Sequence, residues 1–421
     1  MGIKVTVVGG GSTYTPELVE GIANRADRFP VEGLVLLDTD PTRREVVGGL
    51  ASRMLRRLEW PGQLVVTDDR DAALDGADFV LLQLRVGGQA ARLVDETLPV
   101  RFGTIGQETT GAGGFAKALR TVPVVLEIAE EVRRRAAPGA WIVDFTNPVG
   151  IVTQALLDDG HRALGLCNVA IGLQRRFAER FSVSPEEVEL EHVGLNHLSW
   201  ERAVRVGGVD RLPEMLDSDG PELAREMGIP LEVMRRQHAI PSYYLRYYYL
   251  FDEVLREQRE GHSRAADVMA IETRLLELYR DPNLAEKPAL LADRGGAYYS
   301  EAAAQLMASL ADGRGDVQVV DLRNQGALSD LPDDAVVEIP ARIDRDGAHP
   351  LPQQPMIDEV RDLVLRVKAY ERLVLEALRT RDRDTALRAL IANPLVGPYV
   401  EPEPLLAALL EANREFLPEF V

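Results

Sequence analysis

The chain has 421 residues, of which 46% are hydrophobic, and a formal net charge of -19 at pH 7. This length exceeds the size at which a single hydrophobic core keeps growing, so we expect two domains. The negative charge argues against nucleic acid and anionic membrane surfaces as partners, because both repel an acidic chain. A phosphorylated ligand would need arginines placed close to it.

The sequence contains one cysteine, Cys167, so no disulfide can form within the chain and a reducing compartment suits it. The N-terminus runs from Met1 directly into the apolar residues 5–8, without the basic and apolar segments of a secretory signal. No apolar run has the length needed to span a bilayer. We therefore expect a cytoplasmic protein that does not enter a membrane.

Short apolar runs alternate with amphipathic stretches through the first part of the chain. The apolar runs predict strands at residues 3–8, 34–37, 79–84, 141–145 and 163–166. Apolar side chains at three- and four-residue spacing predict helices at residues 17–23, 43–58 and 122–136. This alternation predicts an α/β fold, with a Rossmann-type, doubly wound parallel sheet over residues 1–170.

The pattern changes after about residue 171, and we expect a second, mixed α+β domain over residues 171–421. Strand-like residues lie at 188–205, 317–322 and 335–341. Residues 370–378, 384–392 and 404–413 predict closing helices, and Asn393-Pro394 is typical of a helix stop.

A glycine-rich loop, Gly9-Gly10-Gly11-Ser12-Thr13, follows the first predicted strand directly. Its backbone amides can bind a pyrophosphate at the start of the next helix, where Thr15-Pro16-Glu17 predicts an N-cap, a first-turn proline and an early acid. The dinucleotide fingerprint G-x-G-x-x-G is incomplete, because Tyr14 stands at its third glycine.

Asp38 stands at the end of the second predicted strand. A carboxylate there can accept hydrogen bonds from ribose hydroxyls and repel a 2'-phosphate, which favours NAD over NADP. The alternative is that the glycines only form a tight turn and that Asp38 caps the following helix.

Polar residues occur where other strands are expected to end, namely at residues 106–111, Asn147-Pro148, Cys167-Asn168 and Asn196-His197. Ligands bind at this edge of open parallel sheets. A cysteine with a histidine can hold a first-row divalent ion, although each is more often an ordinary core residue. The tyrosine-rich residues 243–249 are typical of a packed aromatic face, in which one phenol could act as a base if a cation lowers its pKa.

Taken together and in order, these motifs resemble glycoside hydrolase family 4. The motifs are Gly9 to Glu17, Gly106-Gln107-Glu108-Thr109-Thr110-Gly111, Asn147-Pro148, Gly165-Leu166-Cys167-Asn168, Gly194-Leu195-Asn196-His197, Tyr244-Leu245-Arg246-Tyr247-Tyr248, Arg294-Gly295-Gly296 and Asn393-Pro394. The resemblance covers nearly the whole chain.

The resemblance implies a fold like that of lactate and malate dehydrogenases, a bound NAD, a divalent metal, usually manganese, and a homodimer or homotetramer. It also implies a mechanism that differs from the two-carboxylate scheme of most glycosidases. NAD oxidises the sugar C3 hydroxyl, a tyrosine removes the C2 proton, and the metal stabilises the enediolate. The group at C1 then leaves by elimination, water adds, and the hydride returns to C3.

Matching the motifs residue by residue implies the site. Cys167 and His197 are the expected metal ligands, Tyr244 the base, and Glu108 the residue that raises the basicity of Tyr244. The residues expected to contact the substrate are Arg92, Asn147, Asn168 and Arg264. Gly9, Gly10, Gly11, Ser12, Thr13 and Asp38 are the expected NAD-binding residues.

Asn168 separates branches of the family. Alpha-glucosidase members carry an aspartate after the metal-binding cysteine as the acid for the leaving group, and an amide cannot donate a proton in that way. Asn168 therefore favours the 6-phospho-beta-glucosidase branch, acting on phosphorylated disaccharides or aryl glucosides, and leaves that acid unassigned. The alternatives are an alpha-glucoside, galactoside or galacturonide substrate, an NAD-dependent 2-hydroxy-acid dehydrogenase, and a non-catalytic NAD sensor.

Overall fold

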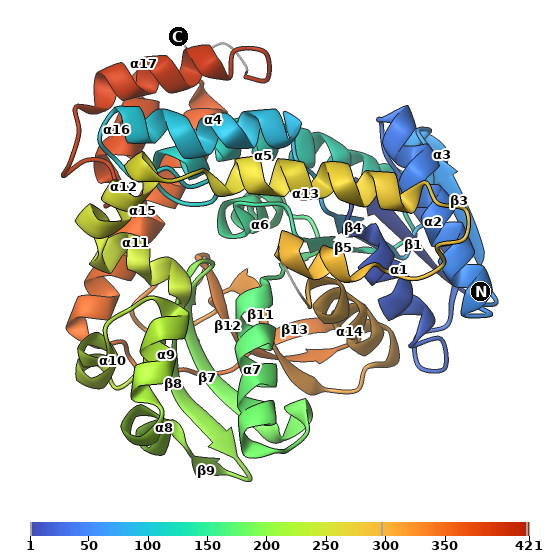
Figure 1. The fold of residues 1–421 in the computed structure, drawn as a ribbon, viewed down its shortest axis with the longest axis horizontal. Coiled ribbons are helices and arrows are strands. Elements are labelled where there is room, and N and C mark those ends of the chain that lie inside the picture. Colours follow the sequence, from blue (N-terminus) through green and yellow to red (C-terminus); the bar gives the residue numbers. More distant parts are fainter. Residues whose placement is uncertain (1, 296–297, 418–419, 421) are drawn as a thin grey trace.

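The computed structural model describes residues 2–295, 298–417 and 420, and a nine-stranded sheet forms its centre (Figure 1). Its parallel part has the order β3-β2-β1-β4-β5-β6, which is the strand order of dinucleotide-binding folds. Its strands are β1 (Ile3–Val8), β2 (Val31–Leu37), β3 (Gln63–Thr67), β4 (Phe79–Leu82), β5 (Trp141–Asp144) and β6 (Ala163–Gly165). The expected doubly wound sheet is confirmed.

Helices connect these strands and cover the sheet, so that the central strands are buried on both faces and read as continuous apolar runs. They are α1 (Thr15–Ala23), α2 (Pro41–Arg57), α3 (Arg70–Leu74), α4 (Gly88–Arg101), α5 (Gly111–Arg135) and α6 (Val149–Asp158). Helix α5 begins well before the expected residue 122. Its first turn contains three glycines and one alanine, so the sequence there does not show a helical pattern.

The sheet continues past β6 into antiparallel strands from the C-terminal half of the chain. Asp321 on β11 pairs with Gly165 on β6, and β12 and β13 follow in order. These strands are β11 (Asp316–Arg323), β12 (Val336–Asp344) and β13 (Gly347–Pro350). The strands expected at residues 317–322 and 335–341 are therefore part of the same sheet as the glycine loop.

A smaller sheet forms the lower lobe of Figure 1. It contains β7 (Val188–Leu195), β8 (Leu198–Val206), β9 (Val209–Asp210) and β10 (Ile240–Pro241), next to α7 (Asn168–Phe181), η1 (Pro185–Glu187), α8 (Leu212–Ser218), α9 (Gly220–Met227) and α10 (Leu231–Gln237). The stretch expected as one strand-like piece at 188–205 is a hairpin. It turns at Asn196 and at His197, whose φ is 60°.

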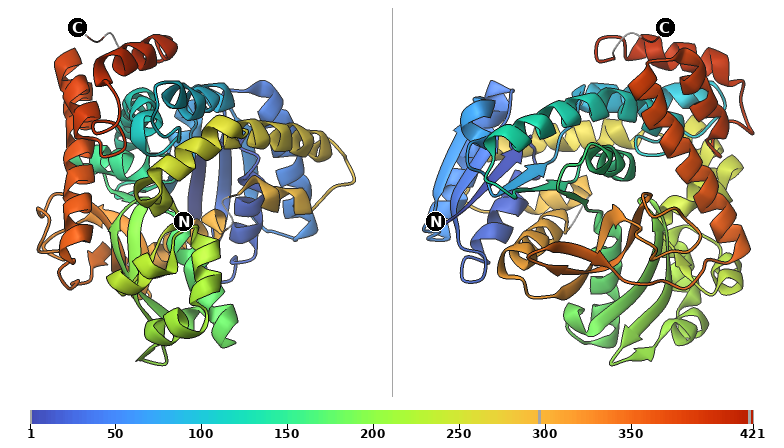
Figure 2. Two further views of the ribbon diagram at one scale, coloured as in Figure 1. Left: turned by 60° about the vertical axis from the view of Figure 1, so that its left-hand side comes forward. Right: turned by 180° about the vertical axis from the view of Figure 1, so that it is seen from behind.

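The remaining helices pack on other helices and on both sheets, and the last three of them close the chain (Figure 2). They are η2 (Tyr243–Leu245), α11 (Arg246–Tyr249), α12 (Phe251–Glu260), α13 (Arg264–Tyr279), η3 (Ala289–Arg294), α14 (Tyr299–Asp312), α15 (Asp358–Thr380), α16 (Arg383–Ala392) and α17 (Pro402–Ala412). The three expected closing helices are present, although α15 begins well before the expected residue 370, and α16 ends directly before Asn393. Among the described helices, none combines the length and apolarity that a membrane crossing requires.

Candidate active site

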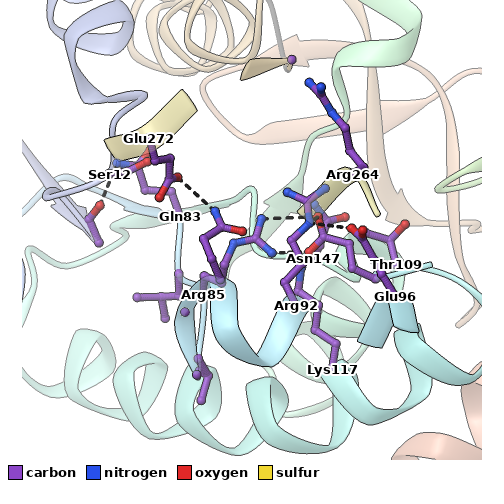
Figure 3. Close-up of a pocket in the computed structure, with 18 of the residues that line it drawn as sticks. Ser12, Gln83, Arg85, Arg92, Glu96, Thr109, Lys117, Asn147, Arg264 and Glu272 are labelled. Carbon is purple, nitrogen blue, oxygen red and sulfur yellow. Dashed lines mark hydrogen bonds and ion pairs between the residues drawn. The ribbon is translucent and has the colours of Figure 1, made fainter. Parts of the chain in front are cut away.

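A cavity of about 1540 Å³ runs along the carboxyl ends of the parallel strands. One end is lined by the glycine loop and Asp38, and the other by the tyrosines of residues 243–247. Figure 3 shows Ser12 and Glu272 toward the first end and Arg92 and Thr109 toward the second. The cavity thus joins the expected dinucleotide site to the expected sugar site.

The glycine loop is shaped by close backbone contacts. Gly9 has a φ of 86°, and a Cβ there would lie 2.7 Å from the carbonyl oxygen of Gln83. A Cβ on Gly11 would lie 2.7 Å from the carboxylate of Asp38, to which the Gly11 amide donates at 2.8 Å. These positions therefore require glycine, and they bring the loop amides to the cavity wall.

The start of α1 differs from the expectation in one respect. Thr15 is the first helical residue, and its hydroxyl donates to the Gly10 carbonyl oxygen at 2.8 Å, so it braces the loop from inside the helix. Tyr14 takes the cap position and lines the cavity.

Asp38 follows β2 and faces the cavity, as a ribose-binding carboxylate should. One of its oxygens accepts from Gly11, and the other accepts from the Asp40 amide at 3.0 Å. Asp40, which accepts from the Arg43 amide at 3.0 Å, is the N-cap of α2. The alternative in which Asp38 caps this helix is therefore wrong, and its role toward NAD stays a prediction.

Glu108 is buried at the centre of a cluster of cations. Its carboxylate accepts from Arg85 and from Lys117 at 2.5 Å, and it forms an ion pair with Arg92, whose Nε lies 3.1 Å away. Burial alone would raise the pKa of Glu108, but Arg85, Lys117 and Arg92 hold that pKa well below its ordinary value. Burial and the neighbouring Arg85 lower the pKa of Lys117 to about 7.

The charge of Glu108 is therefore committed to positioning these cations. The sequence resemblance assigned Glu108 a direct influence on the basicity of Tyr244, and that assignment stays a prediction. The ionised carboxylate and its three cations do form one wall of the cavity that Tyr244 also lines.

His197 and Cys167 are both buried close to the tyrosine end of the cavity. His197 shares one ring nitrogen, Nδ1, with the Thr109 hydroxyl at 2.9 Å, whereas Nε2 has no hydrogen-bond partner among the described residues. Burial lowers the pKa of His197 to about 4, so the ring is neutral at neutral pH. A neutral imidazole with a free buried nitrogen has the form that binds a divalent ion.

Cys167 lies directly before α7, at the end of the β6 strand segment. Burial, and then the charge of Glu338, raise the pKa of its thiol well above the ordinary value. Asn196 bonds to Cys167 and also donates to Glu338 at 2.8 Å, so it links the hairpin turn that carries His197 to the cysteine. The thiol and the orphaned imidazole nitrogen fit a first-row divalent metal.

Tyr244 lines the cavity and stacks on His197, with ring centroids 3.7 Å apart. The ring of Tyr243 stacks on the ring of Tyr244, with ring centroids 4.4 Å apart. The rings of His197, Tyr244 and Tyr243 therefore form one stack. Burial, and then the nearby Tyr243, Tyr299 and Cys167, raise the pKa of the Tyr244 phenol well above its ordinary value. A positive charge near this phenol would be needed for it to act as a base near neutral pH.

The four expected substrate residues all line the same cavity. Arg92 engages Glu96 and Glu108 through its Nε, and a guanidinium has further N–H donors to offer. Asn147 keeps a buried side-chain oxygen without a hydrogen-bond partner in the described part of the chain. Asn168 starts α7 beside Cys167, and Arg264 starts α13 with bonds to two backbone carbonyls of residues 293 and 294.

Several cavity residues have no role assigned from the sequence. Arg85, Lys117, Glu272 and Tyr299 line the cavity, and so does Arg294, which the sequence placed in a motif without a role. A signal existed for Lys117, because it is one of few lysines in the chain and interrupts the apolar face of α5. Gly296, part of one motif of the resemblance, lies outside the described residues.

Comparison with known proteins identifies the family. Residues 4–183 match the model for family 4 glycosyl hydrolases, and residues 192–396 match the model for the C-terminal domain of that family. A probable 6-phospho-beta-glucosidase of Bacillus subtilis is 41% identical over 434 residues, covering 100% of this chain and 98% of the relative.

Solved structures agree with these matches. The 6-phospho-beta-glucosidase of Thermotoga maritima, solved with manganese, NAD+ and glucose-6-phosphate, superposes with a TM-score of 0.93 at 36% identity, covering 99% of this chain and 100% of that one. Malate dehydrogenase of Plasmodium falciparum shares only the fold, with a TM-score of 0.55 at 14% identity over 90% of this chain and 99% of that chain. The expected likeness to hydroxy-acid dehydrogenases is thereby confirmed.

Proposed function

Because this chain belongs to family 4 of the glycosyl hydrolases, we propose that it is a 6-phospho-beta-glucosidase that uses NAD and a divalent metal, such as manganese. One observation carries the proposal: a single cavity contains the glycine loop, the expected sugar-binding side chains and the tyrosine that covers His197. A dinucleotide on the loop and a sugar beside the tyrosine would therefore meet in one enclosed space.

The charge of the cavity favours a phosphorylated sugar. The chain as a whole is strongly acidic, with a net charge of -19, but Arg85, Arg92, Lys117 and Arg264 all line the cavity. Among the described residues, Glu96 and Glu108 are the carboxylates that form ion pairs with Arg85, Arg92 and Lys117. Arg92 and Arg264 are the proposed phosphate-binding residues, because a guanidinium can bind phosphate through two parallel hydrogen bonds. The glucose-6-phosphate bound in the Thermotoga relative supports this substrate class.

Cys167 and His197 would hold the metal, and the loop Gly9-Gly10-Gly11-Ser12-Thr13 with Asp38 would hold NAD. When bound, these groups supply a hydride acceptor and a positive charge that stabilises negative charge on sugar oxygens. Asn147 and Asn168 would orient the sugar hydroxyls from the ends of β5 and β6, since both side chains line the cavity.

Tyr244 is the proposed base for a proton on a sugar carbon. Its ring is fixed between His197 and Tyr243, so the phenol oxygen has little freedom to move. Burial holds the phenol protonated in the absence of a cation. A base whose activity depends on a neighbouring cation would deprotonate substrate only in the fully assembled site.

Further features remain proposals of the same kind. We assign residues 1–170 to NAD binding and residues 171–421 to substrate binding, metal binding and subunit contacts, supported by the positions of the motifs. The site draws Glu108 and Cys167 from the first part and His197 and Tyr244 from the second. A homodimer or homotetramer in the cytoplasm accords with the family and with the single cysteine.

The decisive experiment follows an aryl 6-phospho-beta-glucoside by proton NMR in deuterium oxide, with the protein, NAD and manganese. The proposal predicts release of the aryl group together with exchange of the C2 proton for deuterium. Release without exchange would contradict the mechanism, and the absence of release would contradict the activity.

Matched substrates separate the alternatives. The unphosphorylated beta-glucoside and the 6-phospho-alpha-glucoside should be cleaved poorly, because the first lacks the group that the arginines bind and the second has the other anomeric geometry. If the protein cleaves either of these two substrates faster than the 6-phospho-beta-glucoside, the proposed substrate is wrong. Absorbance at the NADH band should stay constant during turnover, whereas net accumulation of NADH would favour a dehydrogenase.

A further inference from the structure

The tip of the glycine loop is held from outside by a distant segment, α13 to η3. The Tyr279 hydroxyl at the end of α13 donates to the Thr13 carbonyl oxygen at 2.8 Å. The Arg294 guanidinium at the end of η3 lies over the ring of Tyr14, 4.3 Å from its centroid. Two adjacent loop residues therefore contact the two ends of one segment.

Glu272, in the middle of α13, joins this segment to the surrounding elements. One carboxylate oxygen accepts from Arg294 at 2.7 and 3.0 Å and from Gln89 at 3.0 Å. The other accepts from Arg43 at 2.9 Å. Arg43 also donates to the carbonyl oxygen of Gly11 at 3.3 Å, so Glu272 is connected to the loop through α2 as well.

Glu272 is ionised at neutral pH. The side chain is 5% exposed, and burial alone would raise its pKa. Arg294 and Arg43 outweigh that effect and bring the pKa to about 2. Both oxygens of this ionised, buried carboxylate accept hydrogen bonds, so the carboxylate sets the positions of the Arg43 and Arg294 guanidinium groups.

These contacts involve the residue at which the dinucleotide fingerprint is incomplete. The third glycine of the usual motif allows close packing of the helix against the strand. Here Tyr14 occupies that position and directs its ring into the cavity, where it supports Arg294. The loop receives its support from a cation over an aromatic face, in addition to the packing of α1 on the sheet.

We propose that Tyr14, Glu272 and Arg294 form a clasp that retains the dinucleotide. All three line the cavity together with Gly11 and Ser12, so a dinucleotide seated on the loop is bounded by them on that side. They are positioning residues, which hold the α13–η3 segment against the loop. This inference rests on the NAD site of the proposed function and adds the residues that govern how slowly NAD leaves it.

The test is the rate at which bound NAD dissociates, measured by stopped-flow displacement with excess unlabelled NAD from protein loaded with a fluorescent NAD analogue. Tyr14→Ala and Glu272→Gln should each accelerate release at least about tenfold, which corresponds to about 1.4 kcal/mol. Tyr14→Phe keeps the aromatic face and should release the analogue within about threefold of the wild-type rate. Glu277→Gln, an exposed acid on the same helix, is the matched control.

The variants also separate positioning from general loss of structure. Arg294→Lys keeps the charge but loses the planar group, and should accelerate release without lowering the affinity for manganese, which is measured separately by electron paramagnetic resonance. Equal release rates for wild type, Tyr14→Ala, Glu272→Gln and Arg294→Lys would overturn the clasp and leave the NAD site intact. Failure of the wild-type protein to bind NAD would overturn the proposed function and the clasp together.

Discussion

His197 and Tyr244 lie face to face, with ring centroids 3.7 Å apart and an angle of 15° between the ring planes. The proposed base and a proposed metal ligand are thus in direct contact. Because burial raises the pKa of the Tyr244 phenol, a cation held by His197 would lower that pKa again.

Tyr244→Phe keeps the stacked ring and removes only the hydroxyl. We expect kcat to fall by about 100-fold to 10,000-fold, the range for loss of a general base, with NAD and manganese affinities unchanged. Turnover of the aryl 6-phospho-beta-glucoside and C2 exchange by NMR give the measurement. Tyr399→Phe also removes one phenol hydroxyl, from an exposed tyrosine that stacks on Phe251 and does not line the cavity, so it is the control and should retain most activity. If Tyr244→Phe exchanges the C2 proton at the wild-type rate, this tyrosine is not the base.

Cys167→Ala removes the thiol from the proposed metal site while leaving a small buried side chain in its place. We expect the affinity for manganese to fall by at least about 100-fold, because loss of a ligand exceeds the effect of losing an outer-sphere partner. Electron paramagnetic resonance of free manganese measures this without turnover. Ser309→Ala, which also removes one buried polar atom but on α14, should bind manganese normally. Equal affinities in the two variants would exclude Cys167 as a ligand.

Asp38→Ala removes both the expected ribose contact and the acceptor for the Gly11 amide. We expect NAD affinity, measured by calorimetry, to fall by about 10-fold to 100-fold, as for loss of one or two hydrogen bonds to a charged group. Asp38→Asn keeps an acceptor for the Gly11 amide, so its NAD affinity should fall less. In both variants we expect a smaller preference for NAD over NADP. Asp40→Asn preserves the cap of α2 and serves as control. An unchanged NAD affinity in Asp38→Ala would refute the ribose assignment.

His192 predicts a pH-dependent contribution to stability. Burial alone would lower its pKa, but Glu201 at 2.6 Å and Glu338 at 2.9 Å raise it to about 10. A histidine whose folded pKa is raised stabilises fully below its unfolded pKa of about 6.5, and this contribution is lost as the pH rises through 10.

The difference in unfolding free energy between wild type and His192→Gln should therefore be largest near pH 6 and shrink toward pH 10. At pH 6 we expect about 3 kcal/mol, because the variant leaves two buried carboxylates without their cation. Denaturant unfolding at several pH values measures the difference, and comparison at each pH cancels the titration of other groups. His349→Gln, which replaces an exposed histidine on β13, is the control and should show a much smaller difference at pH 6. A difference in unfolding free energy that grows as the pH rises would show that folded His192 is not charged.

The local features of the site could be predicted from the sequence because each depends on neighbouring residues. The glycine loop and the buried strands β1, β2, β4 and β5 carry short apolar runs and sharp turns that are visible in the sequence itself. Strand β3 could not be predicted in this way, because it lies at the sheet edge with all of its residues partly or fully exposed, and its apolar run is only three residues long.

The long-range pairings could not be predicted. Arg43 and Glu272 are 229 positions apart, and nothing local marks either as the partner of the other. Glu108 could be placed in the site by motif, but its three cations come from separate elements and change what its charge does. Asp321 could not be recognised as a partner of Gly165, because a mixed sheet can be extended from any later strand.

That pairing of Asp321 with Gly165 limits how this protein can be divided for expression. A polypeptide ending at residue 183, where the first family match ends, would retain β6 but lose β11, the strand that covers its outer edge. The uncovered backbone groups of β6 would then be available to strands of other chains, which favours aggregation. Production of the N-terminal half as an independent NAD-binding unit should therefore give insoluble material unless the new edge is blocked.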